Sequence, residues 1–181
     1  MSAPGGGRPL TRKRALIASA VASVAIGAVL VALDARMMDA GGPGIIDFEL
    51  AGTQERADEI LADWGDRGTD AAKASLWLDY AYIVAYGTFL VLAALATRDL
   101  AEQRGRDRLA SFGLAVIPFA AAAAAFDAIE DVGLLLAVNQ QGGDLAPRLA
   151  QVCASFKFAL VALTIAYLLA GLALRLRRSP A

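Results

Sequence analysis

Four long apolar segments constrain the fold of this chain more than any other feature. They cover residues 15–33, 76–97, 109–136 and 151–174, and each reaches or approaches the roughly 20 residues that a helix needs to cross about 30 Å of hydrocarbon. With 57% hydrophobic and 19% charged residues, the chain is too apolar for an ordinary soluble domain. The sequence therefore predicts an all-α integral membrane protein, folded as an antiparallel four-helix transmembrane bundle.

The distribution of charge predicts how the bundle is oriented. Eleven Lys and Arg residues lie in three segments, residues 1–14, 98–108 and 175–181, whereas the loop over residues 34–75 holds ten acidic residues against four basic ones, a net charge of −6. Because basic loops stay in the cytoplasm, both termini are predicted to be cytoplasmic, and the loops 34–75 and 137–150 extracytoplasmic. Fourteen Arg against three Lys indicate a bacterial genome rich in G and C. The predicted location is the bacterial plasma (inner) membrane, in a multi-pass topology.

The first apolar segment also has features of a secretory signal peptide. The basic triplet Arg12-Lys13-Arg14 stands before an apolar run of nineteen residues. The apolar core of a signal peptide is usually only about 7 to 15 residues long and ends at a small-x-small cleavage site, which is not evident here. The sequence therefore favours a retained membrane anchor over a cleaved signal.

The acidic loop is expected to contain a short amphipathic helix over about residues 53–64. Thr53 is a suitable N-cap, and Ile60, Leu61 and Trp64 share one helical face. Such a helix can rest on the membrane surface or cap the mouth of the bundle. The alternative is a solvated loop with some helical content. Residues 65–70 are predicted to form a turn before the second span.

Charged residues inside the apolar segments are the strongest functional signal. A charge in hydrocarbon is expensive, so it normally faces a protein interior or a wet cavity and marks a function or a structural ion pair. Lys157 lies about one turn inside the fourth segment, and the acidic residues of the second and third segments lie at a similar depth. The bundle is expected to gather a polar cluster, open to the external side, of Asp79, Tyr82, Tyr86, Asp127, Glu130, Asp131 and Lys157. Asp47 and Glu49 are candidate contributors from the loop.

Charge balance within this polar cluster limits its chemistry. Four carboxyls face one ammonium, and Asp127 and Asp131 form an i, i+4 pair of like charges. Three explanations stay open: a proton held by a carboxyl, a bound divalent cation, or exposure of Glu130 and Asp131 to outside water. Asp127 is the favoured partner of Lys157. A buried pair of this kind could serve only to fix the register of the third and fourth spans.

Missing residue types exclude several classes of protein. The chain has no histidine, which excludes histidine-based general base catalysis and histidine-ligated zinc or haem. Its single cysteine, Cys153, cannot form an intramolecular disulfide. We find no phosphate-binding glycine loop and no basic patch interleaved with aromatic residues, so nucleic acid is not an expected partner. No cofactor is predicted beyond the divalent cation named above.

A set of short motifs resembles the pattern of small, uncharacterised four-span bacterial membrane proteins. The motifs are Asp47-Phe48-Glu49, Leu78-Asp79-Tyr80, Phe126-Asp127 with Glu130-Asp131, and Lys157-Phe158. The resemblance covers most of the chain after residue 44. It implies the four-helix architecture and supplies no catalytic residues.

Three hypotheses about function follow from these observations. The leading one is a non-enzymatic membrane protein that binds a small ligand, a lipid headgroup, a proton or a cation at the polar cluster, with a role in transport or as a partner subunit. The alternative is a membrane-embedded enzyme that uses its carboxylates on a lipid of the external leaflet. The third is a structural subunit held together by a buried ion pair. Membrane lipid is the expected partner, together with another membrane protein or a second copy of the chain.

Overall fold

The described part of the chain consists of helices joined by short connections. The computed structural model describes residues 8–176, with side chains from residue 11 on, and no strand occurs in this range. The helices are α1 (Arg8–Asp39), α2 (Ile45–Glu49), α3 (Gln54–Gln103), α4 (Asp107–Val138) and α5 (Leu145–Leu176). All but α2 are long and apolar enough to cross a membrane. The predicted all-α bundle of four long helices is thereby confirmed. Parts of the predicted basic ends, residues 1–7 and 177–181 with Arg177 and Arg178, lie outside the described residues.

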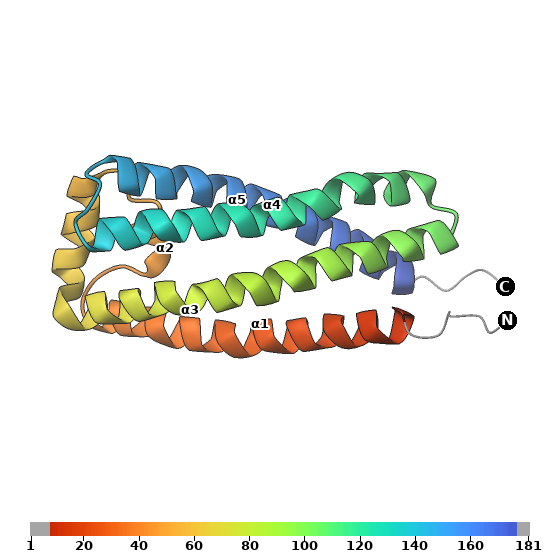
Figure 1. Ribbon diagram of the computed structural model, residues 1–181, viewed down its shortest axis with the longest axis horizontal. Helices are drawn as coiled ribbons and strands as arrows, with labels where there is room; N and C mark the ends of the chain where they lie inside the picture. Colours follow the sequence, from red (N-terminus) through yellow and green to blue (C-terminus); the bar gives the residue numbers. More distant parts are fainter. Residues whose placement is uncertain (1–7, 177–181) are drawn as a thin grey trace, which may run out of the picture.

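The four long helices all run along the length of the bundle (Figure 1). In this view α1 and α4 run away from the end that holds both termini, and α3 and α5 run back toward it. Helices α3, α4 and α5 pack on one another, whereas α1 packs mainly along α3. Only 6% of the most apolar stretch of α1 is buried, against 33% for α3. Helix α1 therefore forms the edge of the bundle, and an ion pair of 2.6 Å between Arg12 and Asp99 ties it to α3.

Helix α3 changes direction sharply at Gly65. This residue has φ 55° and ψ −166°, a left-handed conformation that favours glycine. Residues 54–64, here called the crosswise segment, consequently lie across the end of the bundle opposite the termini (Figure 1). Thr53 is the N-cap of this segment, and its side chain accepts a hydrogen bond from the Arg56 N–H. The predicted turn over residues 65–70 was too long, because one glycine with positive φ redirects the chain and helix resumes at Asp66.

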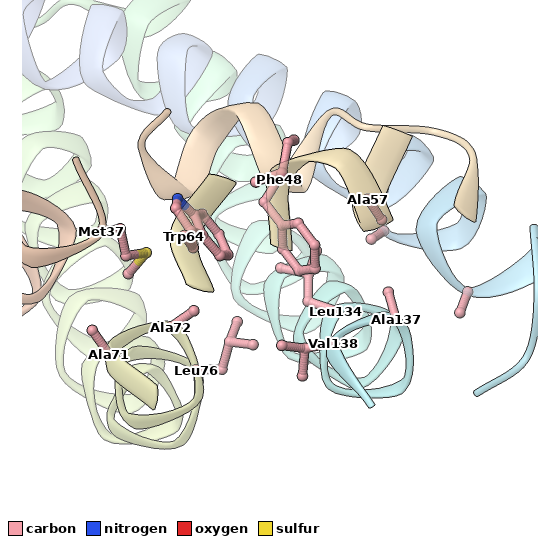
Figure 2. Close-up of a cluster of buried hydrophobic side chains, with 13 residues drawn as sticks. Met37, Phe48, Ala57, Trp64, Ala71, Ala72, Leu76, Leu134, Ala137 and Val138 are labelled. Atoms are coloured by element: carbon pink, nitrogen blue, oxygen red, sulfur yellow. The ribbon is translucent and has the colours of Figure 1, made fainter. Parts of the chain in front are cut away.

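The crosswise segment caps the bundle through its apolar face. Trp64 is fully buried, its ring centroid lies 5.1 Å from that of Phe48 in α2, and its Nε1–H donates to the Pro43 carbonyl at 2.6 Å. Figure 2 shows these two rings beside each other and close to Leu134 and Val138 of α4. The same cluster therefore holds the crosswise segment and α2 against the end of the bundle.

Two glycines bring α4 close to both of its neighbours. A Cβ atom at Gly133 would lie 2.9 Å from the Ala146 carbonyl oxygen of α5, and one at Gly87 would lie 2.9 Å from the Ala124 Cβ. These close approaches lie on either side of residues 127–131 along α4. The stretch of α4 that carries the acidic residues is thus held tightly between α3 and α5.

Substituting Gly133 by valine should therefore destabilise the bundle. The added side chain would meet backbone atoms of α5 that cannot move independently, and overpacking of this kind typically costs about 1 to 3 kcal/mol. Thermal unfolding of the purified protein in detergent measures the effect. The control is Ala121→Val on an exposed position of the same helix. Equal unfolding midpoints for the two variants would show that α4 and α5 do not approach as closely as described.

Candidate functional site

Helix α4 carries three acidic side chains on one face. Asp127, Glu130 and Asp131 follow at i, i+3 and i+4, a spacing that places them together on a helix, and they are 4%, 0% and 2% exposed. Exposure of Glu130 and Asp131 to outside water, one explanation left open by the sequence, is therefore wrong. Both side chains lie in the stretch of α4 between its close approach to α3 at Ala124 and its close approach to α5 at Gly133, and Lys157 of α5 contacts Glu130.

Lys157 of α5 lies among carboxylates from two other helices. Its Nζ is 2.8 Å from Glu130 Oε1, 2.9 Å from Asp127 Oδ1 and 3.4 Å from Glu49 Oε2. The side chain is only 10% exposed. One ammonium thus contacts Asp127, the partner favoured by the sequence, and two further carboxylates as well.

Helix α2 supplies the third of these carboxylates. Phe48 is buried in the apolar cluster, and the adjacent Glu49 consequently reaches Lys157 with a side chain that is only 13% exposed. Burial raises the pKa of the Glu49 carboxyl above its ordinary value, against the opposing effect of the Lys157 ammonium. Asp47, the other loop candidate, is exposed and lines no part of the site.

Sequence reasoning missed the residue that anchors the start of α2. The Asp34 carboxylate, near the end of α1, accepts a hydrogen bond of 2.6 Å from the backbone N–H of Ile45, the first residue of α2. No local pattern distinguishes Asp34 from the other nine acids of its loop. Its role appears only when α1 and α2 are seen side by side.

Two tyrosines of α3, Tyr82 and Tyr86, line the same cavity as these acidic residues. The Tyr86 hydroxyl donates a hydrogen bond of 2.6 Å to Asp127 Oδ2, and the Tyr82 ring centroid lies 5.1 Å from that of Tyr86. Both oxygens of Asp127 are therefore engaged, Oδ1 by Lys157 and Oδ2 by Tyr86. This network fixes the orientation of the Asp127 carboxylate.

Asp79 of α3 completes a group of three carboxylates, here called the acidic triad. Asp79, Asp127 and Asp131 each offer an oxygen within 4.8 Å of the others. Among residues 11–176, no Lys or Arg forms an ion pair with Asp79 or Asp131. We call the five carboxylates around Lys157 the acidic centre: Glu49, Asp79, Asp127, Glu130 and Asp131.

A cavity of about 370 Å³ adjoins the acidic centre. The triad, Lys157 and Glu49 line its polar part, and its apolar wall includes Leu30 of α1 and Val161 of α5. These two helices do not pack extensively on each other. A ligand or water in this cavity would therefore lie next to the acidic centre.

Comparisons with protein-family models, with curated proteins and with solved structures found no match. The geometry of the acidic centre is therefore the basis for any inference about function.

Proposed function

We propose that this chain is a multi-pass membrane protein that binds a cation at the acidic centre. One observation carries the proposal: Lys157 contacts Glu49, Asp127 and Glu130, while Asp79 and Asp131 have no basic partner among residues 11–176. In the part of the chain whose side chains are described, Lys157 is therefore the only basic side chain paired with the acidic centre, and it pairs with three of the five carboxylates.

Neutralisation of the surplus acids is a physical requirement. An ionised carboxylate away from water is costly unless it is paired, coordinates a metal or takes up a proton. The triad oxygens lie close together and adjoin a cavity. A cation in that cavity would neutralise the charges of Asp79 and Asp131 together. Lys157 forms an ion pair with neither of them.

The proposed orientation follows from the basic segments of the sequence. The acidic centre lies toward the end of the bundle that is capped by the crosswise segment, opposite both termini (Figure 1). If the basic ends stay in the cytoplasm, the cation arrives from the external side of the bacterial plasma membrane. A role in cation transport or sensing fits this arrangement.

Thermal unfolding in detergent tests cation binding without assuming which cation binds. We expect at least one of three classes, a monovalent metal, a divalent metal or an organic amine, to raise the unfolding midpoint, because a ligand at about 100 times its Kd stabilises a protein by about 2.7 kcal/mol. The rise should disappear in Asp131→Asn and persist in Glu55→Gln, which removes an exposed acid. A parent chain whose midpoint no cation raises would contradict the proposal.

A further inference from the structure

The acidic triad points to a more specific ligand than a cation of any kind. We propose that Asp79, Asp127 and Asp131 together hold one hard divalent cation of the Mg²⁺, Mn²⁺ and Ca²⁺ class. This inference rests on the proposed function and narrows it from any cation to a divalent metal ion at three named ligands.

The spacing of the triad oxygens fits such an ion. One oxygen from each carboxylate lies within 4.8 Å of the other two. Oxygens bound at 2.0 to 2.6 Å around a six-coordinate ion lie roughly 3 to 5 Å from one another. The ligands come from α3 and α4, so the ion would join two helices whose close approach at Gly87 is already fixed.

Asp131 provides a second, independent observation. Its side chain is 2% exposed, lines the cavity, and its Oδ2 has no hydrogen-bond partner among the described residues. A buried carboxylate oxygen without a partner carries its full desolvation penalty. A metal ion in the cavity that coordinates Asp131 Oδ2 would compensate for the desolvation of this oxygen.

Lys157 and Tyr86 would orient Asp127 for metal binding, and they do not occupy the place of the metal ion. They contact the two oxygens of Asp127, and each carboxylate oxygen has a further lone pair available for a metal ion. Groups that hold a ligand from outside the coordination sphere commonly orient it for metal binding. Neither Lys157 nor Tyr86 forms a hydrogen bond or ion pair with Asp79 or Asp131.

The type of donor selects the class of metal. All three donors are carboxylate oxygens, which suit Mg²⁺, Mn²⁺ and Ca²⁺, whereas the chain offers no histidine for softer transition metals. The remaining coordination positions would face a cavity of about 370 Å³. That volume accommodates several water molecules at about 30 Å³ each, as ions of this class require.

Electron paramagnetic resonance of Mn²⁺ tests the assignment. The full chain in detergent is stripped with a chelator and titrated with Mn²⁺ alone, and loss of the sharp signal of the free aqua ion measures binding. We expect one Mn²⁺ per parent chain and affinity at least 10-fold weaker in Asp131→Asn and in Asp79→Asn. Glu55→Gln should bind like the parent, and Asp131→Glu should retain part of the affinity.

Three results separate the inference from the proposed function. If Mn²⁺ does not bind but a monovalent metal or an organic amine raises the unfolding midpoint, the divalent site is wrong and cation binding stands. If Mn²⁺ binds equally well to the parent, Asp131→Asn and Asp79→Asn, the ion is held elsewhere and the triad assignment falls. If no cation acts on the parent chain, both proposals fall. Should Asp131→Asn not fold, the half-buried Asp79 supplies the deciding variant.

Discussion

Substituting Lys157 by methionine is expected to lower the free energy of unfolding by about 3 to 5 kcal/mol, the usual effect of removing one partner of a buried ion pair. The loss is large because the Lys157 ammonium contacts Glu49, Asp127 and Glu130 at 3.4, 2.9 and 2.8 Å. Methionine preserves most of the volume and removes the ammonium group, with its charge and its hydrogen bonds to Glu49 and Glu130. Chemical unfolding in detergent micelles, followed by circular dichroism, measures the change.

Two further variants isolate the cause of that loss. Lys13→Met removes an exposed cation from α1 and should leave stability within about 0.5 kcal/mol of the parent, as for most surface substitutions. Adding Glu130→Gln to Lys157→Met removes the charge of the nearest carboxylate and should restore part of the stability. If Lys157→Met is as stable as Lys13→Met, the ammonium is not the counter-charge of the acidic centre.

Substituting Trp64 by alanine is expected to destabilise the protein by a similar amount, about 3 to 5 kcal/mol for a large buried aromatic residue. Trp64 is 1% exposed, packs on Phe48 and donates a hydrogen bond to the Pro43 carbonyl. Its loss would leave a cavity beneath the crosswise segment and loosen α2, which carries Glu49 to Lys157. Thermal unfolding reports the loss of stability, and hydrogen exchange of residues 45–50 reports the loosening of α2.

Conservative and exposed substitutions provide the comparison. Trp64→Phe keeps ring packing on Phe48 but loses the N–H bond to Pro43, so it should cost only about 1 kcal/mol from that bond. Trp77→Ala removes an indole that is 68% exposed and should change stability little. Equal stabilities for Trp64→Ala and Trp77→Ala would mean that the crosswise segment does not cap the bundle.

The bundle could be predicted from the sequence because its causes are local. The length of each apolar segment decides whether a helix can span a bilayer, and no distant residue alters that length. The crosswise segment was also predictable, since Thr53, Ile60 and Trp64 provide a cap and an apolar face within one short stretch. A turn over residues 65–70 was predicted as well, but its exact position at Gly65 was not, because any residue of that glycine- and aspartate-containing stretch could have redirected the chain.

The site was predictable only where the cost of burying a charge gave a signal. Lys157 and Asp127 interrupt apolar segments, and the structure brings them to 2.9 Å. Glu49 was named only as one of two loop candidates, and Asp34 was missed, because the places of both depend on how α2 packs against the end of the bundle. The burial of Glu130 has the same non-local origin, since segments far away in the sequence cover it.

Anomalous diffraction from crystals soaked in Mn²⁺ is the most direct test of cation binding at the acidic centre. We expect one anomalous peak among the carboxylates of Asp79, Asp127 and Asp131, about 2.0 to 2.6 Å from an oxygen of each, the range of hard divalent cations. The peak should be absent from Asp131→Asn crystals soaked in the same way. No peak at the acidic triad of the parent protein, or an identical peak in Asp131→Asn crystals, would show that Asp79, Asp127 and Asp131 do not hold a divalent cation.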